Sequence, residues 1–483
     1  MRTTCRPLLL MALIPVLIFS ITGCSKGGNH SDPVVPPDTS KPVTQSDMAF
    51  WLTKADQTVL LKQQNVILSF SATASVSPVI TVDTTVTYQP IDGFGYALTG
   101  GSAYLINGLA AGDRDKLLKE LFLTDSNSIG VSYLRVSIGA SDMSANVFSY
   151  DDSATPDTAM ANFDLSFDKA DLVPLLQRIV ALNPSIKILG SPWSAPLWMK
   201  DNNNSVGGSL QPQYYAAYAR YFVKYIQAMK AAGITIDAIT PQNEPENPYN
   251  NPSMTLTAAQ EAEFIKSNLG PALQAAGLNT KIIVFDHNCD HPIYPLTIYG
   301  DADALKYADG AGFHLYAGDI GALGQVHDAY PAKNLYFTEQ YVASSGNFGG
   351  DLGWHVKNLI IGASRNWSRN VLEWNLANDP SYGPHTTGGC SNCLGALTIG
   401  TTISRNVSYY IIAHAAKFVR PGSVRVGSNN FGNLPNVAFV TPEGKKVLIV
   451  LNATSSSQQF GIQFKGKTVT TSLDAGAVGT FLW

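Results

Sequence analysis

The most constraining feature of the sequence is a regular alternation of short apolar runs with helical stretches between residues 90 and 376. Each run is rich in β-branched or aromatic residues and ends in a polar tip. Alternating strands and helices favour a parallel sheet covered by helices, and eight strands predict a closed (β/α)8 TIM barrel of the α/β class. The runs are IDGFGYAL (91–98), YLRVSIG (133–139), IKILGSPW (186–193), IDAITPQNE (236–244), KIIVFDHN (281–288), GAGFHLY (310–316), NLYFTEQ (334–340) and NVLEWNL (370–376).

Two of the intervening stretches show the helical pattern clearly. Residues 219–233 and 258–277 have apolar side chains at three- and four-residue spacing, the period of one helix face. No G-x-G-x-x-G segment follows any of the eight runs. The open nucleotide-binding sheet, in which that motif precedes the first helix, is therefore disfavoured.

The segments on either side of the barrel have a different pattern, in which short alternating runs are separated by Gly, Pro and Asn. VILSFSATA (66–74) and VITVDTTVTY (79–88) are strand candidates before the barrel, and residues 437–452 predict a hairpin that turns at Glu443–Gly444. We therefore expect residues 48–88 and 418–483 to form one all-β sandwich, with the barrel spanning residues 89–417.

The N-terminus has the pattern of an export signal. Arg2 and Arg6 precede an apolar stretch from Leu8 to Ile21, too short for a membrane span, which ends in a sequence resembling a bacterial lipobox around Cys24. We expect residues 1–24 to be a lipoprotein signal peptide with lipidation at Cys24, and residues 25–47, rich in Pro, Gly, Ser and Asp, to be a flexible linker. An ordinary signal peptide is the alternative.

This pattern predicts an exported protein, lipid-anchored to the bacterial outer membrane and facing the periplasm or the cell surface. The formal net charge of −4 and the absence of a long basic run argue against a nucleic-acid partner. We expect a monomer that needs no cofactor.

The remaining cysteines suggest local structure rather than a metal centre. Cys390 and Cys393 form a C-x-x-C without a second pair at zinc spacing, so a local disulfide is favoured over a zinc ribbon or a redox motif. His287, Cys289 and His291 alternate in one loop and offer a metal hypothesis, but Asp286 or His287 is a better candidate for contacting a ligand. We expect no metal.

Polar residues at the strand tips define the candidate site, because active sites of such barrels lie at the C-terminal ends of the strands. Two of them are carboxylates, Glu244 at the end of the fourth run and Glu339 near the end of the seventh. Hydrolysis of a glycosidic bond needs such a pair, about 5–5.5 Å apart in retaining enzymes. Solvated surface glutamates are the alternative, which the aromatic neighbours disfavour. The tip residues are Arg135, Trp193, Asn243, Glu244, His314, Tyr316, Glu339 and Trp374.

The motifs resemble those of glycoside hydrolase family 30, closest to its glucosylceramidase and β-1,6-glucanase branch. They are GFG (93–95), YLRVS with SDMS (133–144), SPWSAPLWMK (191–200), QNEPEN (242–247), FHLY (313–316), YFTEQ (336–340) and LEWNL (372–376). The resemblance implies a retaining hydrolase with Glu244 as general acid/base, which needs a raised pKa, and Glu339 as nucleophile. It also implies substrate-binding roles for Arg135, Asp142, Trp193, Asn243, His314, Tyr316 and Trp374.

The same comparison favours β-1,6-glucan as substrate over glucosylceramide. Gly100 and Gly101 stand where glucosylceramidases have an acidic residue, and Leu315 replaces a second aromatic residue. Three alternatives stay open: a glucosylceramidase or exo-β-glucosidase, a xylan-cleaving relative, and a non-catalytic glycan-binding lipoprotein of the cell surface.

Overall fold

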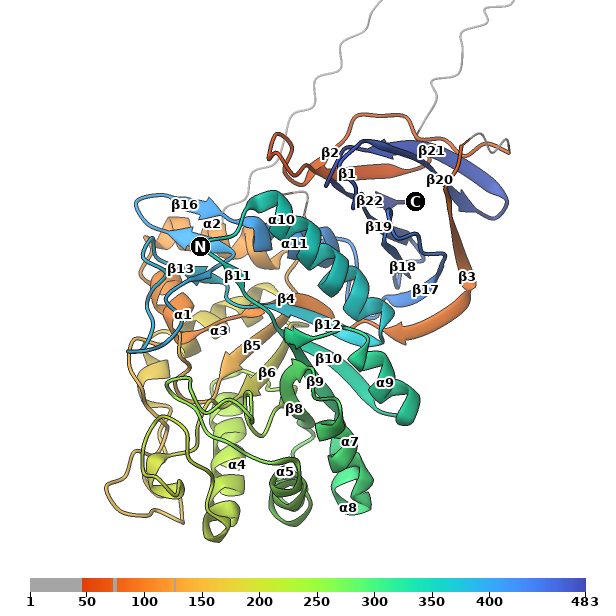
Figure 1. The fold of residues 1–483 in the computed structure, drawn as a ribbon. Coiled ribbons are helices and arrows are strands. Elements are labelled where there is room, and N and C mark those ends of the chain that lie inside the picture. Colours follow the sequence, from red (N-terminus) through yellow and green to blue (C-terminus); the bar gives the residue numbers. More distant parts are fainter. Residues whose placement is uncertain (1–45, 73–75, 126) are drawn as a thin grey trace, which may run out of the picture. The chain divides into compact units, whose positions relative to one another are not determined.

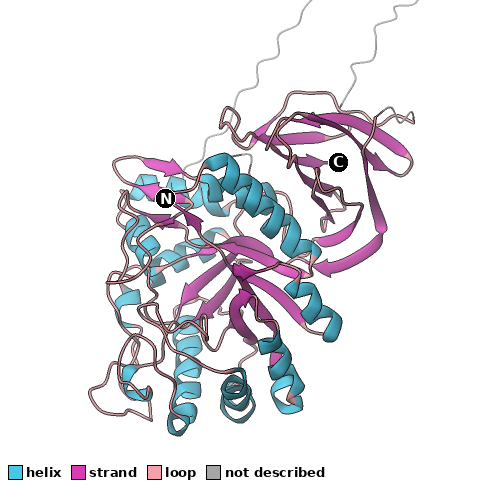
Figure 2. Cartoon of the chain, viewed as in Figure 1, coloured by secondary structure: helices cyan, strands magenta, loops and turns pink. Residues whose placement is uncertain are grey.

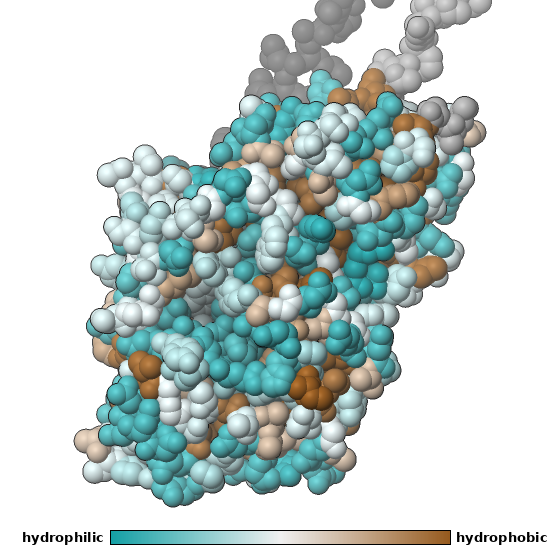
Figure 3. Space-filling view, viewed as in Figure 1, coloured by the Kyte–Doolittle hydropathy of each residue, from teal (hydrophilic) through white to brown (hydrophobic). Residues whose placement is uncertain are grey.

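The structure is a computed structural model that describes residues 46–72, 76–125 and 127–483. The predicted signal peptide, its Cys24 and linker residues 25–45 lie outside the described residues. Within these ranges no helix is both long and apolar enough to span a membrane. Hydrophilic and hydrophobic side chains are interspersed on the face drawn in Figure 3.

Eight parallel strands close into a barrel, as the sequence predicts (Figure 1). Each strand pairs with the next along the chain, and the last, β12, closes the barrel between β10 and β4. All eight predicted runs therefore lie in barrel strands or continue into their C-terminal tips. The strands are β4 (Gly93–Ala97), β5 (Tyr133–Ser137), β6 (Lys187–Ser191), β7 (Ala238–Ile239), β8 (Lys281–Cys289), β9 (Ala308–Gly318), β10 (Asn334–Glu339) and β12 (Ser368–Glu373).

Helices surround these strands, and Figure 2 shows them in cyan around the magenta barrel. The predicted helices at 219–233 and 258–277 correspond to α4 and to the run α5–α6, in which a π-helical segment (Ile265–Leu269) joins the two helices. A longer π-helical segment, Val356–Ala363, continues α10. The helices are α1 (Gly100–Asn107), α2 (Ala111–Phe122), α3 (Leu172–Leu182), α4 (Tyr215–Ala231), α5 (Ala258–Phe264), α6 (Gly270–Ala275), α7 (Ile293–Gly300), α8 (Ala302–Leu305), α9 (Ala322–Ala329), α10 (Phe348–His355) and α11 (Val407–Ala416).

Strands from both sides of the barrel sequence form one nine-stranded sheet, in the order β2-β1-β22-β19-β18-β17-β3-β20-β21. The long strand β3 pairs with β17 near one end and with β20 near the other, so the sheet folds over a core of its own. Its strands are β1 (Ala49–Thr53), β2 (Lys62–Gln63), β3 (Val79–Pro90), β17 (Val424–Ser428), β18 (Asn436–Val440), β19 (Lys446–Leu451), β20 (Gln458–Phe464), β21 (Lys467–Leu473) and β22 (Val478–Leu482).

The loops at the C-terminal end of the barrel contain short strands. Two small sheets join β11 with β14 and β13 with β15 and β16. These strands are β11 (Val342–Ala343), β13 (Ala377–Asn378), β14 (Cys393–Leu394), β15 (Leu397–Ile399) and β16 (Ile403–Arg405).

The sandwich differs from the sequence prediction at its N-terminal edge. The predicted hairpin forms between β18 and β19, but residues 66–72, the described part of VILSFSATA, form no strand and touch β21 at one isolated bridge, Ser71 with Thr468. Val66 and Ile67 are 48% and 62% exposed, so this run lacks the half-buried alternation of a strand. Asp47, assigned to the linker, already donates its N–H to the Leu68 carbonyl.

One face of the sandwich packs against the barrel domain, and the other faces the core of the sandwich itself. Alternate residues of β18 and β19 face opposite ways, as expected for strands. Ala438, Leu448 and Val450 lie in the core of the sandwich, whereas Phe439 and Ile449 pack with the barrel helices. The sandwich therefore covers apolar helix surface that would otherwise face water.

Candidate active site

A polar layer lies above an apolar floor inside the barrel. Tyr133, Leu189, Ala238, Ile283, Tyr336 and Leu372 form one buried cluster. Side chains two positions further along a strand point the same way, so the next inward layer is built from the residues that follow these by two. In this layer stand Arg135, Ser191, Thr240, Thr338 and Trp374.

Strand β8 departs from this spacing by one residue. The register between β8 and β9 shifts between Phe285 and His287, and both Phe285 and Asp286 have positive φ, 74° and 57°. A bulge of this kind re-aims the side chains that follow it. It turns Phe285 out against Tyr294 and Phe313 and places Asp286 in the polar layer.

Asp286 is fully buried and accepts hydrogen bonds on both carboxylate oxygens. Oδ2 accepts from Arg135 (2.7 Å), Ser191 (2.8 Å) and Thr240 (2.9 Å), and Oδ1 from Thr338 (2.6 Å). Burial alone would raise the pKa of Asp286, but the Arg135 charge and His314 hold it far below its usual range. The fixed negative charge of Asp286 therefore organises the base of the site.

Glu339, at the tip of β10, is held by two donors. Arg135 donates to Oε2 at 2.5 Å and the Tyr316 hydroxyl donates to Oε1 at 2.9 Å. Arg135 also donates to the Asn243 Oδ1 at 2.6 Å, and its guanidinium carbon lies 4.8 Å from the centre of the Trp193 ring. One buried guanidinium thus fixes the orientation of Glu339 and Asn243 together.

Glu244 follows β7 in a left-handed backbone conformation, with φ of 46°. Its N–H donates to the Asp286 carbonyl, and its Oε2 accepts from Asn247 (2.8 Å) and Asn250 (3.3 Å). Residues held in this sparsely populated region cluster at functional sites. The local turn presents the carboxylate to the inside of the barrel mouth.

His314, on β9, joins the two glutamates to Asp286. Its Nδ1 lies 3.2 Å from Oε1 of Glu244 and 3.9 Å from Oε1 of Glu339, and its Nε2 lies 3.1 Å from Oδ1 of Asp286. The two glutamate oxygens are therefore no more than about 7 Å apart. This bound includes the ~5–5.5 Å of retaining enzymes and only the lower edge of the roughly 6.5–9.5 Å of inverting ones.

The pKa values of the cluster differ from the sequence expectation. Burial opposes the charge on His314, but Glu339, Asp286 and Glu244 raise its pKa to about 9. Burial raises the pKa of Glu339, against the charges of His314 and Arg135. Burial would also raise the pKa of Glu244, yet His314 holds it at about 2. The expected raised pKa of Glu244 is wrong for the free site, because an imidazolium from another strand lies beside it.

A cavity of about 530 Å³ opens above the two glutamates. Trp193 and Trp374 line one wall with ring centres 5.2 Å apart, and Asp142 also faces the cavity. Burial, with the charges of Glu339 and Glu244, raises the pKa of Asp142 to about 7. Three predicted substrate-binding residues, Arg135, Asn243 and His314, do not line this cavity, and each contacts a carboxylate or Arg135 beneath it.

Several lining residues were not singled out from the sequence. Asn247, Tyr249 and Asn250 come from the loop after Glu244, and Tyr341 packs 5.4 Å from Tyr316. The run PENPYNN had a usable signal, since Asn residues three and six positions after a candidate acid can fold back onto it. Asp286 was considered for ligand contact, but it is fully buried and absent from the lining.

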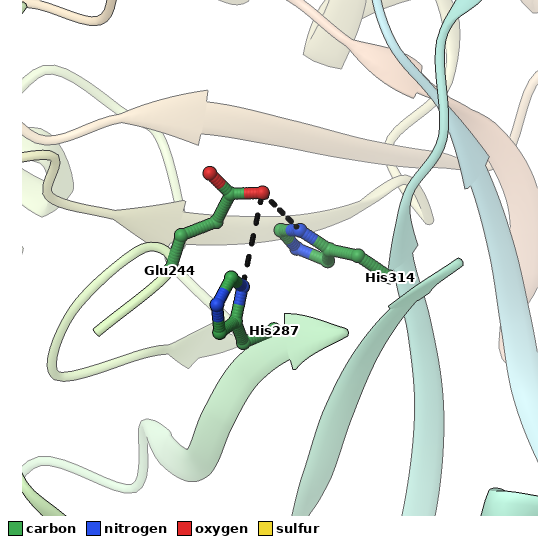
Figure 4. Close-up of side chains that lie close together, drawn as sticks. All are labelled: Glu244, His287 and His314. Carbon is green, nitrogen blue, oxygen red and sulfur yellow. Dashed lines mark hydrogen bonds and ion pairs between the residues drawn. The ribbon is translucent and has the colours of Figure 1, made fainter. Parts of the chain in front are cut away.

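Cys390 and Cys393 form a disulfide at the rim of the cavity. The loop triad of the metal hypothesis does not come together in the described part of the chain. Cys289 is buried, and His291 Nδ1 lies 2.8 Å from a carboxylate oxygen of Glu246. Instead, Glu244, His287 and His314 bring one ligand atom each within 4.8 Å of one another (Figure 4).

This arrangement fits a glycosidase, and comparison with known proteins decides the family. Residues 91–419 match the glycosyl hydrolase family 30 TIM-barrel domain, and residues 422–481 match its beta sandwich domain. The chain belongs to glycoside hydrolase family 30. The family 30 chain is therefore a glycoside hydrolase, as the sequence motifs indicated.

Three known proteins are similar to this hydrolase over most of its length. An endo-1,6-beta-D-glucanase of Aspergillus fumigatus is 35% identical over 395 residues, 75% of this chain and 78% of that protein. A putative glucosylceramidase of Caenorhabditis elegans is 30% identical over 405 residues, 78% and 76% of the two chains. The solved structure of the endo-beta1,6-glucanase BT3312 has a TM-score of 0.85 and 36% identity, covering 91% of this chain and 99% of that one.

Proposed function

We propose that this family 30 hydrolase is an endo-acting enzyme, which cleaves β-1,6 bonds in the interior of a glucan polymer. The observation that carries the proposal is the agreement of two comparisons. The fungal relative and the solved structure, at 35% and 36% identity, are both described as endo-1,6-β-glucanases. The cavity contains both glutamates and two tryptophan rings, a lining suited to the apolar face of a pyranose ring.

The reaction proceeds by double displacement through Glu339 and Glu244. Glu339 attacks the anomeric carbon while Glu244 gives its proton to the departing glycosidic oxygen, and a covalent glycosyl-enzyme forms. Glu244 then takes a proton from the water that attacks this ester and releases Glu339. Arg135 and Tyr316 hold Glu339 in the attacking orientation, and Arg135 also fixes Asn243 beneath the cavity.

Glu244 obtains its proton from His314 as substrate binds. His314 carries a proton at neutral pH, and its Nδ1 lies 3.2 Å from the Glu244 carboxylate. Substrate binding must raise the pKa of Glu244 above that of His314 before the proton can move from Nδ1 of His314 to Oε1 of Glu244.

The test is a product analysis on pustulan, a β-1,6-glucan, with glucosylceramide and xylan in parallel and Glu339→Gln as control. We expect gluco-oligosaccharides from pustulan alone and none from the variant. Glucose from glucosylceramide instead would transfer the substrate assignment to the alternative. Glycan retention without products in both proteins would contradict the enzymatic role proposed for Glu339.

Glucosylceramide hydrolysis is the alternative that the 30% identical nematode relative favours. The glycine pair that begins α1, Gly100 and Gly101, supports the glucanase. A side-chain carbon added at Gly101 would lie 2.7 Å from the Met143 carbonyl oxygen and 2.8 Å from that of Pro384. The backbone around Gly101 therefore leaves no room for a side chain at this position. Glucosylceramidases resemble one another in having an acidic residue near this point, and such a residue would not fit at Gly101.

We also propose that the enzyme is exported and anchored by lipid at Cys24, as a monomer. The basic residues, apolar stretch and lipobox-like ending of the N-terminus support the export and the lipid anchor. Expression in a bacterial host with radiolabelled palmitate should give a labelled protein in the membrane fraction. Cys24→Ala should remove the label, and label retained in that variant would contradict the anchor.

A further inference from the structure

We propose that Glu244, His287 and His314 form a binding site for a divalent transition-metal ion of the Zn²⁺ class. The three side chains come from different parts of the barrel mouth and point toward one another (Figure 4). Each offers one ligand atom: Oε1 of Glu244 and the Nδ1 atoms of the two histidines. Two imidazoles and one carboxylate are a ligand set that zinc uses in proteins.

The distances are close to those that zinc requires. Zinc–ligand bonds of about 2.0–2.2 Å in a tetrahedron separate neighbouring ligand atoms by roughly 3.3–3.6 Å. Oε1 of Glu244 lies 3.2 Å from Nδ1 of His314 and 3.8 Å from Nδ1 of His287, and all three ligand atoms lie within 4.8 Å of one another. A small rotation of His287 completes the three-ligand face.

His287 supplies an independent sign of a ligand. Its side chain is about nine-tenths buried, and its Nδ1 has no hydrogen-bond partner. Buried polar nitrogens are normally paired, and an unpaired one needs an explanation. A metal ion between Glu244 and His314 would use this nitrogen.

His314 is already oriented as a metal ligand. Its other ring nitrogen, Nε2, lies 3.1 Å from Asp286, and Asp286 is fixed by Thr338 at 2.6 Å. A carboxylate behind a histidine is the common support for metal-binding imidazoles in proteins. This pair leaves Nδ1 pointing at Glu244, where the ion would lie.

Charge and access also suit a dication. Around His314, the carboxylates of Glu244, Glu339 and Asp286 face one guanidinium, that of Arg135. Once the ion has displaced the proton from His314, this leaves an excess of two negative charges. Glu244 and His287 line the cavity, so the ion can enter from solvent and keep a water as its fourth ligand.

The consequence is reversible inhibition. A metal ion on Oε1 of Glu244 occupies the oxygen that takes up the catalytic proton, and it displaces the proton from His314. This consequence rests on the role of Glu244 proposed above, whereas metal binding itself does not. Competition between metal and substrate follows, because both need Glu244 exposed to the cavity.

Isothermal titration calorimetry of the full chain with ZnCl2, in a buffer that does not chelate zinc, tests the site directly. We expect one ion per chain. His287→Ala and Glu244→Gln should each weaken binding at least about tenfold. His291→Ala, a matched control four residues from His287 and paired with Glu246, should bind like the unaltered protein.

The outcomes are separable from the substrate assignment. Absence of saturable binding to the unaltered protein would overturn the site, as would equal weakening by His287→Ala and His291→Ala. Saturable binding that the two ligand variants lose supports it, even if pustulan proves not to be a substrate. Where activity is measurable, zinc should raise KM for the hydrolysed glucan, and EDTA should restore it.

Discussion

At the scale of single residues, Arg135 connects most of the catalytic machinery. Its side chain is fully buried; Nη1 donates to Glu339, and Nη2 donates to both Asn243 and Asp286. A guanidinium presents several donors in a rigid planar fork, which an ammonium cannot do. Arg135 therefore acts by positioning carboxylates rather than by contacting sugar.

Arg135→Lys should keep the charge and lose this geometry. Lysine can reach Glu339 or Asp286 but not both in the same orientation, so we expect kcat on pustulan to fall at least about 100-fold, near 2.7 kcal/mol of transition-state stabilisation, with a smaller change in KM. Steady-state kinetics measure both. Arg178→Lys, at a half-exposed site beside Asp115, is the control, and an equal loss there would refute the argument.

Tyr249 is a candidate contact for the leaving part of the glucan. It is 83% exposed, lines the cavity and follows Glu244 by five residues. Tyr249→Ala should lower kcat/KM on β-1,6-gluco-oligosaccharides about tenfold, roughly 1.4 kcal/mol, and leave 4-nitrophenyl β-glucoside hydrolysis nearly unchanged. Tyr104→Ala, exposed on α1, is the comparison; similar losses on both substrates would contradict a role in substrate choice.

At this scale the sequence predicted the identity of the site better than its electrostatics. Glu244 and Glu339 were found from their places at strand tips, and both line the cavity. The low pKa of Glu244 was missed because it depends on His314, 70 residues away. The burial of Asp286 beneath the cavity, instead of in its lining, was missed because it depends on a one-residue bulge, which spacing along one strand does not reveal.

At the scale of elements, α11 is fastened to the sandwich by a buried histidine. The two ring nitrogens of His414 lie 2.8 Å from the hydroxyls of Thr480, on β22, and Thr53, on β1. Burial lowers the pKa of His414 to about 3, so the folded chain keeps this ring neutral. The contact joins α11, β22 and β1, and the order of these elements along the chain does not predict that they meet.

This histidine makes stability depend on pH. The unfolded chain protonates His414 near pH 6.5 and the folded chain only near pH 3, so its contribution is complete above pH 6.5 and is lost as pH falls toward 3. The expected loss from pH 7 to pH 5 is about 2 kcal/mol. Denaturant unfolding at both pH values should show a smaller loss in His414→Phe than in the unaltered protein, and equal losses would exclude this histidine.

The prediction of strands succeeded in the barrel, where burial of the strands determines the pattern of apolar residues. All eight barrel runs were identified because parallel strands buried on both faces are continuous apolar segments. Strand β1 was missed, and residues 66–72 were predicted wrongly as a strand. Both lie at the edge of the sandwich, where pairing with the distant strands β22 and β21 decides which segment becomes extended.

At the scale of the whole molecule, the sandwich is part of the barrel's structural support. Phe439, Ile449 and Val478 belong to the same buried cluster as the barrel helices. A chain that ends at residue 421 loses β17–β22 and exposes this helix surface. We expect it to be largely insoluble on expression, whereas a chain that begins at residue 46 stays soluble; the soluble fraction and the thermal transition measure this. A cooperative transition in the shortened chain would contradict the dependence.

The position of the barrel between β3 and β17 has a consequence for synthesis. Strand β1 pairs along its length with β22, from Ala49 with Leu482 to Thr53 with Val478, so this pairing cannot form until residue 482 has been made. Until then its edge is unpaired and open to association with other chains. Nascent chains that have not yet reached β22 therefore lack a complete sandwich sheet, and a holding chaperone has a defined segment, residues 49–53, to protect.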